Sequence, residues 1–280
     1  MRPMNLPESA LAPLPLPTPA LYVLIGAAGS GKTHIATAFP RDWRLSLDAC
    51  RQRISDAGDQ AATPDAVTLF DAALNGRLAR RRPTVVDATS TNLADRAHLV
   101  KYAHQHQLPA VAIAARTPLA LCLARQAPRP TNRQVPEHVV TEQHAGVPTT
   151  EQLLKEGFDQ VHDATDLDLL RLLLERSAAA GPNALAAVRA AFGDDLARVF
   201  AFDAGDRSRG AFVVAGRQLA VRWWDEAEPY EAHWEARLDG TCPGCGDGTL
   251  WVEVTSARDL LDVYNGGQPD EPVCDVCDAL

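Results

Sequence analysis

Residues 26–33, which read G-A-A-G-S-G-K-T, constrain the fold of this chain more than any other feature. They fit the phosphate-loop pattern G-x-x-x-x-G-K-[ST], and the apolar run LYVLI stands directly before them. A buried parallel strand followed by a glycine-rich turn and a helix is the context in which this pattern binds phosphates. We therefore predict that the loop binds ATP or another nucleoside triphosphate through Gly26, Ala27, Ala28, Gly29, Ser30, Gly31, Lys32 and Thr33.

Lys32 and Thr33 carry side chains with separate expected roles. A lysine at this place of the loop reaches the β- and γ-phosphates, and the hydroxyl of the following threonine ligates Mg²⁺. The loop alone does not decide whether the γ-phosphate goes to water, to a substrate or nowhere.

Short apolar runs alternate with helical stretches through the first half of the chain. The runs lie at residues 21–26, 44–47, 84–87, 109–115 and 156–162, and the helices at 32–39, 65–80, 94–107, 118–126 and from about residue 136. Such alternation is typical of a parallel sheet covered by helices on both faces. We predict an α/β fold of the P-loop NTPase type.

Asp48 follows the second predicted strand, at the sheet edge where open α/β folds bind their ligands. Arg51 comes one helical turn later and is expected in the same cleft. The carboxylate can accept a proton from an attacking hydroxyl, and the arginine can hold an anionic group of the acceptor. The alternative is a helix-capping aspartate beside a solvated arginine.

Asp87 ends the hydrophobic run TVVD and is predicted to hold Mg²⁺ or its waters, as a Walker B carboxylate does. Arg96, nine residues later, is expected in the following helix. We predict that Arg96 joins Arg51 in substrate binding.

Five segments in a fixed order carry a resemblance: GAAGSGKT, SLDACR, VVDATSTNLADR, RPTNRQVP and EGFDQVH. Over about residues 20–163 the chain resembles the P-loop polynucleotide 5′-kinases, which transfer the γ-phosphate of an NTP to the 5′-hydroxyl of DNA or RNA. The resemblance implies Lys32 and Thr33 for the phosphates and metal, Asp48 as general base, Arg51 as a clamp on the acceptor strand, and nucleic acid 5′ ends as partners. One departure is that Ser90 stands where the family usually has Asn, and Asn92 follows two residues later.

The resemblance also implies a lid of arginines over the triphosphate, for which Arg125, Arg129 and Arg133 are the candidates. Pro128 and Pro130 independently force this stretch out of a helix. We predict that Arg125 binds the nucleotide and that Arg129 and Arg133 stabilise charge during transfer. The alternative is three solvated arginines on an exposed loop.

Four of the six cysteines form two C-x-x-C pairs, Cys242 with Cys245 and Cys274 with Cys277. Each pair can place two thiolates on one turn, and four thiolates make the closed tetrahedral site of a structural Zn²⁺. We expect a zinc-ribbon-like site with a small β-ribbon between the pairs; two redox pairs and an iron site are the alternatives. Cys50 and Cys122 are expected as ordinary thiols.

The charge differs between the two halves of the chain. Residues 1–164 carry 17 Lys/Arg and 15 Asp/Glu, and the remainder carries 10 and 21. The acidic rear half disfavours general nucleic-acid coating there and suits a protein partner. Trp223, Trp224, Trp234 and Trp251 lie among its acidic residues and are expected mainly to pack in a core.

We predict three segments: a proline-rich lead-in at 1–19, a kinase domain at 20–164, and a smaller α+β module at 165–280 with the Cys₄ site. Within this module, Leu- and Ala-rich helices are expected at 166–180 and 183–192. Strand-like runs follow as RVFAF (198–202), GAFVVAG (210–216) and RQLAVRWW (217–224). The prolines interrupt any secretory signal, and no run of about 18 apolar residues suggests a membrane span, so a cytoplasmic protein is expected. The kinase hypothesis has two alternatives: a kinase of a small molecule or nucleotide sugar, and an ATP-driven switch with a zinc interaction module.

Overall fold

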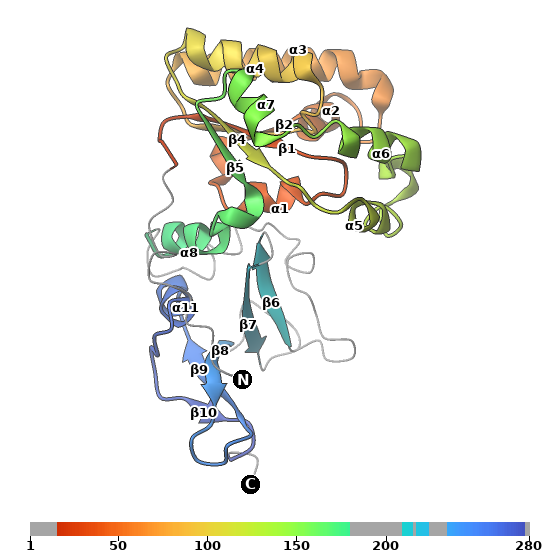
Figure 1. Cartoon of the computed structure of the whole chain (residues 1–280). Helices are drawn as coiled ribbons and strands as arrows, with labels where there is room; N and C mark the ends of the chain where they lie inside the picture. The colour runs from red at the N-terminus through yellow and green to blue at the C-terminus, as the bar shows by residue number, and fades with distance from the viewer. Residues whose placement is uncertain (1–15, 180–208, 215–216, 224–233, 278–280) are drawn as a thin grey trace.

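The computed structural model describes residues 16–179, 209–214, 217–223 and 234–277. Two sheets make up this part of the chain, a helix-covered parallel sheet and a second, antiparallel sheet nearer the C-terminus (Figure 1). Several predictions fall outside the described residues: the lead-in up to residue 15, the helix at 183–192, the strand-like run RVFAF at 198–202, and Trp224 with the acidic residues that follow it.

The first sheet has five parallel strands in the order β2-β3-β1-β4-β5. Their bounds are β1 (Leu21–Ile25), β2 (Arg44–Ser46), β3 (Thr84–Asp87), β4 (Ala110–Ala114) and β5 (Gln160–Asp163). Val23 of β1 pairs with Val86 of β3 on one side and with Ala112 of β4 on the other. All five predicted strands are therefore confirmed, and residues 26–33 leave the central strand at the edge where ligands of open α/β sheets bind.

Seven helices accompany this sheet in the described residues. They are α1 (Lys32–Thr37), α2 (Leu47–Ile54), α3 (Thr63–Ala79), α4 (Leu93–Gln105), α5 (Leu119–Ala124), α6 (Glu137–Ala145) and α7 (Thr150–Lys155). Short 3₁₀ turns lie at η2 (Arg41–Trp43), η3 (Gln60–Ala62), η4 (Thr131–Arg133) and η5 (Ala164–Asp166). The five predicted helices are present, and α2 and α7 are additions that the sequence pattern did not separate.

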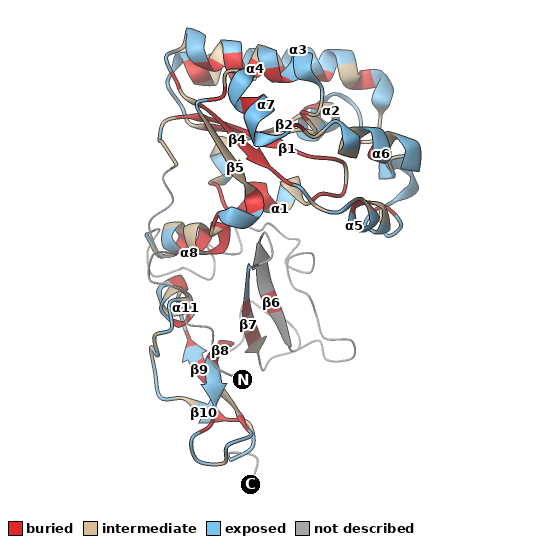
Figure 2. Cartoon of the chain, viewed as in Figure 1, coloured by how far each residue is buried: buried red, intermediate tan, exposed pale blue. Residues whose placement is uncertain are grey.

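Side chains of the central strand alternate between two apolar layers, as a buried strand requires. Leu21, Val23 and Ile25 pack in the layer with α3, α4 and α7. Tyr22 and Leu24 pack in the other layer with residues of α1. Both faces of the parallel sheet are thus covered. The inner strands β1 and β4 are buried, whereas the outer helix faces are exposed (Figure 2).

The second sheet is antiparallel with the order β10-β9-β8-β7-β6. Its elements are β6 (Arg209–Val214), β7 (Arg217–Trp223), β8 (Trp234–Thr241), β9 (Thr249–Val254), α11 (Ala257–Tyr264) and β10 (Val273–Cys274). The runs at 210–216 and 217–224 were predicted as strands, and β6 and β7 confirm them. Between the cysteine pairs the simple ribbon expected from the sequence is wrong, because α11 lies between β9 and β10. Trp234 and Trp251 are buried, which confirms core packing for these two.

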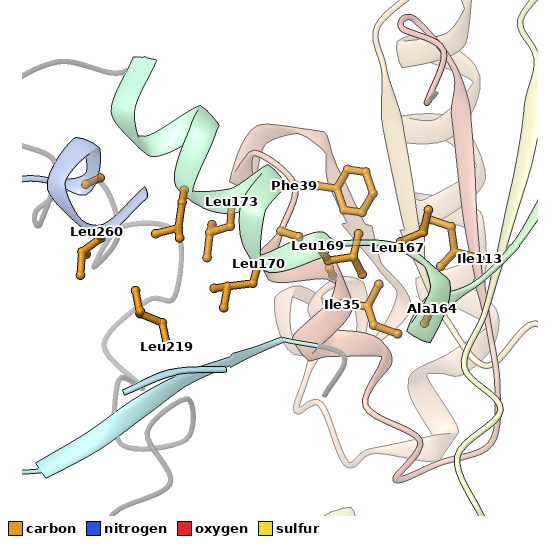
Figure 3. Packing of buried hydrophobic residues seen from close by; sticks show 14 of the residues in the cluster. Ile35, Phe39, Ile113, Ala164, Leu167, Leu169, Leu170, Leu173, Leu219 and Leu260 are labelled. Carbon is orange, nitrogen blue, oxygen red and sulfur yellow. The ribbon is translucent and has the colours of Figure 1, made fainter. Parts of the chain in front are cut away.

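Helix α8 (Leu169–Ala179) packs against both sheets. One apolar cluster runs from Ile35 and Phe39 of the α1 region, through α8, to Leu219 of β7 and Leu260 of α11 (Figure 3). The hydroxyl of Tyr264 adds a 2.9 Å hydrogen bond to the carboxylate of Asp168. The predicted boundary after residue 164 lies directly behind β5, and it stays a prediction, since the apolar cluster continues across it.

None of the helices in the described part of the chain has the length and apolar character needed to cross a membrane.

Candidate active site

The phosphate loop follows β1 and is held in a conformation that needs glycine. Gly29 and Gly31 have φ values of 85° and 94°, in the left-handed region that residues with a Cβ rarely adopt. At Gly29 a Cβ would also lie only 2.4 Å from the carbonyl oxygen of Cys122. The pattern of glycines in the sequence therefore reflects both backbone conformation and the close approach of α5.

Lys32 directs its ammonium group back into the loop. Its Nζ donates to the carbonyl oxygens of Gly26 and Ala27, each at 2.8 Å. Burial lowers the pKa of Lys32 to about 8, and the negative charge of Asp87 opposes part of that effect. A half-buried cation held by loop carbonyl oxygens is suited to exchange these partners for phosphate oxygens.

Thr33 and Asp87 lie together at the end of β3. The Thr33 hydroxyl is hydrogen-bonded to the Asp87 carboxylate. Burial raises the pKa of Asp87 above its usual value, and the positive charge of Lys32 offsets only part of that increase. A hydroxyl and a carboxylate are oxygen ligands of the kind that Mg²⁺ prefers. The two residues therefore fit the metal site predicted for them.

Asp48 lies in the first turn of α2 rather than at the tip of β2. The hydroxyl of Ser46 caps this helix by accepting from the Ala49 amide, so the capping role considered for Asp48 belongs to Ser46. The Asp48 side chain is 71% exposed, and its charge acts on both Lys32 and Asp87. The carboxylate therefore lies within electrostatic range of Lys32 in the phosphate loop and of Asp87.

Arg51, one turn further along α2, forms an ion pair with Asp48. Its side chain is only 11% exposed, and its Nε donates to the carbonyl oxygen of Ala57 at 3.1 Å. The guanidinium is thereby fixed beside the carboxylate rather than solvated.

The three candidate lid arginines occupy different positions along the segment after α5. The Nη1 of Arg125 donates to the carbonyl oxygen of Gly29 at 3.0 Å, so this side chain lies on the phosphate loop. Arg129 donates to Gln126 at 3.3 Å, and its charge contributes to the lowered pKa of Lys32. Arg133 is exposed at the end of η4. The structure thus brings Arg125 onto the loop and Arg129 within electrostatic range of Lys32.

A contact that we name the clasp, formed by Asp56, Gly58 and Asn132, joins the lid to the segment after α2. The Asp56 carboxylate accepts from the Gly58 amide at 2.8 Å and from the Asn132 side chain at 3.4 Å. A Cβ on Gly58 would lie 2.5 Å from the Asn132 carbonyl oxygen. The backbone after Arg51 therefore touches the lid between Arg129 and Arg133.

Arg96 was predicted to bind substrate, but the structure places it in a buried ion pair. Its Nε and Nη2 donate to the two Glu156 carboxylate oxygens at 2.6 and 2.7 Å, and Nη1 donates to the Ser90 carbonyl oxygen at 3.0 Å. The side chain fastens α4 to the end of α7. We correct the interpretation accordingly: the surroundings of Arg96 explain it as a structural residue.

Ser90 and Asn92 are the residues at which the chain departs from the pattern of the polynucleotide 5′-kinases, and each has a structural role. Ser90 is buried and has a φ of 48°, a conformation that asparagine tolerates better than most residues. Asn92 caps α4 by accepting from the Ala94 amide at 2.8 Å. Asn92 therefore serves the helix, and Ser90 occupies the turn.

Sequence reasoning missed three residues that support the phosphate loop from outside. Gln143 of α6 accepts from the Ala28 amide at 2.9 Å, the Thr117 hydroxyl donates to the Ser30 carbonyl oxygen at 2.8 Å, and His144 is hydrogen-bonded to the Thr117 carbonyl oxygen at 3.1 Å. No motif marks them, because a polar residue on a helix of mixed composition, such as Gln143 or His144, or in a loop, such as Thr117, carries no local signal.

The four cysteines of the C-x-x-C pairs converge at the far end of the second sheet. All four sulfur atoms lie within 4.8 Å of one another, with 3.9 Å between Cys242 and Cys277 and 3.7 Å between Cys245 and Cys274. A tetrahedral Zn²⁺ with bonds of about 2.3 Å needs sulfur–sulfur distances of about 3.8 Å. The cluster therefore has the dimensions of a closed, four-thiolate metal site.

Backbone amides support the sulfur atoms. Gly244 donates to Cys242, Gly248 to Cys245 and Cys277 to Cys274, at 3.3 to 3.4 Å. Hydrogen bonds from the amides of Asp247 and Gly248 lower the pKa of Cys245 to about 7, which favours the thiolate that a metal binds. A Cβ on Gly248 would lie 2.2 Å from the Cys274 sulfur, so this position requires glycine.

Residues 21–150 match the model of the AAA_33 family, described as an AAA domain. The parallel sheet, its loop and its helices have the P-loop kinase fold. This fold implies ATP and Mg²⁺ as ligands.

Comparison with solved structures gives partial matches that include three proteins. A gluconokinase from Sinorhizobium meliloti is 21% identical with a TM-score of 0.37, over 61% of this chain and 91% of that chain. A shikimate kinase from Acinetobacter baumannii in complex with shikimate is 17% identical with a TM-score of 0.38, over 57% and 91%. The tunicamycin resistance protein of Deinococcus radiodurans is 19% identical with a TM-score of 0.35, over 58% and 95%. No curated protein matches the chain.

Proposed function

We propose that this protein is a Mg²⁺-dependent kinase that transfers the γ-phosphate of ATP to the 5′-hydroxyl end of DNA or RNA. The observation that carries the proposal is the position of Asp48. Its exposed carboxylate is paired with Arg51, and its charge acts on both Lys32 and the Asp87 that binds Thr33. These features support Asp48 as a proton acceptor within electrostatic range of the residues proposed to hold phosphate and metal.

Bound ATP·Mg²⁺ would supply the γ-phosphoryl group to the acceptor oxygen, and ADP would be the leaving group. Lys32 leaves the loop carbonyls for the phosphate oxygens, while Thr33 and Asp87 hold the metal. Asp48 accepts the proton of the attacking hydroxyl, and Arg129 neutralises charge that develops during transfer. Arg51 orients the acceptor next to its base.

The 5′ end of a nucleic acid is the acceptor we favour for two reasons. The segments around Asp48, Asp87 and the lid follow the order found in polynucleotide 5′-kinases. In addition, Arg51 offers a fixed cation beside the general base, which suits the phosphate that follows a 5′-terminal nucleoside. A small molecule or a nucleotide sugar would need the same base and differ only in what the arginine holds.

The test uses purified full-length protein, γ-labelled ATP, Mg²⁺ and three acceptors in parallel: a 5′-hydroxyl DNA oligonucleotide, its RNA equivalent, and the same DNA with a 5′-phosphate. We expect label on the first two and none on the third, and loss of that label in Asp48→Ala. Label that appears only in free phosphate would instead indicate an ATP-driven switch. Full-length protein that labels neither oligonucleotide, yet labels a sugar or nucleotide-sugar mixture, would indicate the small-molecule alternative.

We also propose that Cys242, Cys245, Cys274 and Cys277 hold a structural Zn²⁺. The distances between their sulfur atoms and the amide hydrogen bonds to them support it. Metal analysis of the purified protein should give one zinc per chain, and Cys245→Ser should lower that ratio and the thermal stability of the second sheet. Cys50→Ser, which removes a buried thiol remote from the pairs in sequence, is the control and should keep its zinc. Iron in place of zinc, or a reversible disulfide in each pair, would contradict the proposal.

A further inference from the structure

Helices α5 and α6 pack on the outer side of the phosphate loop. Ala27 of the loop forms a small apolar cluster with Cys122 of α5 and Val140 of α6. This cluster is separate from the two large apolar layers of the sheet. The loop is therefore supported on a side that faces away from the strands.

Within this support, Gln143 makes a specific contact with the loop backbone. Its side-chain oxygen accepts from the Ala28 amide at 2.9 Å. The carbonyl oxygen of the same peptide group, that of Ala27, accepts from Lys32 Nζ at 2.8 Å and from the Ser30 amide at 3.1 Å. Both polar groups of the Ala27–Ala28 peptide are thus engaged, one by α6 and the other from within the loop.

The residue after Gln143 provides a second connection. His144 is hydrogen-bonded at 3.1 Å to the carbonyl oxygen of Thr117, whose hydroxyl donates at 2.8 Å to the carbonyl oxygen of Ser30. Two adjacent residues of α6 therefore fix the loop at Ala28 and, through Thr117, at Ser30.

We propose that Gln143 is a positioning residue that keeps the phosphate loop in its nucleotide-binding conformation, an inference that rests on the nucleotide binding assumed in the proposed function. Lys32 must release the carbonyl oxygens of Gly26 and Ala27 to reach phosphates. The bond from Gln143 does not involve Lys32, so it holds the peptide plane while the lysine moves. Because preorganised amides bind phosphate without a cost of ordering, loss of this bond should weaken nucleotide binding.

The test compares Gln143→Met, which keeps the length of the side chain but lacks a strong acceptor, with the wild type and with Glu142→Gln, an exposed neighbour on the same helix. Equilibrium binding of Mg²⁺ with a fluorescent ATP analogue is measured without any acceptor. Loss of one hydrogen bond should raise the Kd about three- to ten-fold in Gln143→Met, with little change in Glu142→Gln. In turnover assays the KM for ATP should rise by the same factor while the KM for the acceptor stays constant.

Two further measurements separate positioning from general stability. Hydrogen exchange should accelerate at residues 26–31 in Gln143→Met while the strands keep their protection. If Gln143→Met folds poorly, Gln143→Asn, which keeps the amide but is one methylene too short, should show the same rise in Kd. An unchanged Kd together with unchanged exchange would overturn the inference. Wild-type protein that binds ATP but labels no oligonucleotide would overturn the proposed acceptor alone, and the Kd comparison would still decide the role of Gln143.

Discussion

The phosphate side and the acceptor side of the proposed active site are built differently. On the phosphate side, Lys32 and Asp87 are half-buried, their pKa values are shifted mainly by loss of solvent, and the phosphate loop is fixed by glycine conformations and by contacts from α5 and α6. On the acceptor side, Asp48 is 71% exposed, and it is held by one ion pair to Arg51 on a short helix.

The difference in burial indicates which of the two sides tolerates substitution. Burial makes the phosphate side costly to change, because a displaced charge or a misplaced amide in a low-dielectric site has no water to compensate it. The exposure of Asp48 makes this carboxylate adaptable, since it can be replaced without disturbing a core, whereas Arg51 beside it is held in place. The comparison predicts that changes on the acceptor side alter transfer but not nucleotide binding, and that changes on the phosphate side alter binding first.

Replacing Asp48 with Asn should give the largest separation between the two sides. Loss of a general base is expected to lower kcat by roughly 100- to 10,000-fold, while the Kd for ATP stays within about two-fold of wild type. Single-turnover kinetics and equilibrium nucleotide binding measure the two quantities. Asp65→Asn is the matched control, because Asp65 is also an exposed aspartate in the first turn of a helix. A kcat close to wild type in Asp48→Asn would remove Asp48 from the chemistry.

Replacing Gly29 with Ala tests the phosphate side. The new Cβ would meet the Cys122 carbonyl oxygen at 2.4 Å and would also face a left-handed φ of 85°. Strain of this kind costs about 1–3 kcal/mol, so ATP binding should weaken by roughly ten- to 100-fold as the loop shifts. Gly240→Ala provides the control, because Gly240 has a φ of 100° and a methyl group added there would have no neighbouring atom within 4 Å. Equal binding by the two variants would mean that the packing of α5 on the loop has no effect on the nucleotide.

The lowered pKa of Lys32 predicts that the affinity for ATP depends on pH, through a group that lies on the phosphate side. Lys32 has a pKa of about 8 in the free protein, so its ammonium is lost as the pH rises through that value. Affinity for ATP should be level below pH 8 and then fall by up to about ten-fold per pH unit. Folding stability should respond in the opposite sense, because an unfolded lysine keeps its proton to near pH 10.5 and the burial of the charge is relieved above pH 8.

Nucleotide binding between about pH 6.5 and 9.5, together with denaturant unfolding over the same range, measures both trends. Lys32→Met supplies the reference, since its affinity should be weak and level with pH. An affinity for ATP that does not decline above pH 8 in the wild type would show that Lys32 is not the group that binds the phosphates in its charged form.

The phosphate side could be predicted from the sequence because its signal is local. Glycine spacing, a strand before the loop and Lys32 with Thr33 fix a backbone conformation within eight residues, and a hydrophobic run delivers Asp87 beside it. The five parallel strands were equally predictable from alternating apolar runs. The cysteine cluster was predictable too, since two short turns bring each pair of sulfurs together.

The errors arise where long-range contacts decide. Arg96 looked like a substrate contact because it follows Asp87, but its partner Glu156 lies 60 residues away in the chain. Gln143 approaches Ala28 from 115 residues away and belongs to no motif. Helix α11 interrupts the expected ribbon because its apolar face packs on α8, which the cysteine spacing does not reveal. Such contacts depend on packing between elements and leave no pattern within either segment.

Replacing Gly58 with Ala should produce the smallest effect and the sharpest test of the acceptor side. A methyl group there would meet the Asn132 carbonyl oxygen at 2.5 Å and push the clasp apart. The neighbouring Ala57 carbonyl oxygen accepts from Arg51, so the displacement should reach the residue that orients the acceptor.

We expect the KM for the acceptor to rise about three- to five-fold, as for a modest overpacking strain, while the Kd for ATP stays unchanged. Gly76→Ala, which introduces a methyl group in α3 with only ordinary contacts, is the control and should leave both constants unchanged. If the Kd for ATP rose by the same factor as the KM for the acceptor, the clasp would act on both sides of the site. The phosphate side and the acceptor side would then be less independent than their difference in burial suggests.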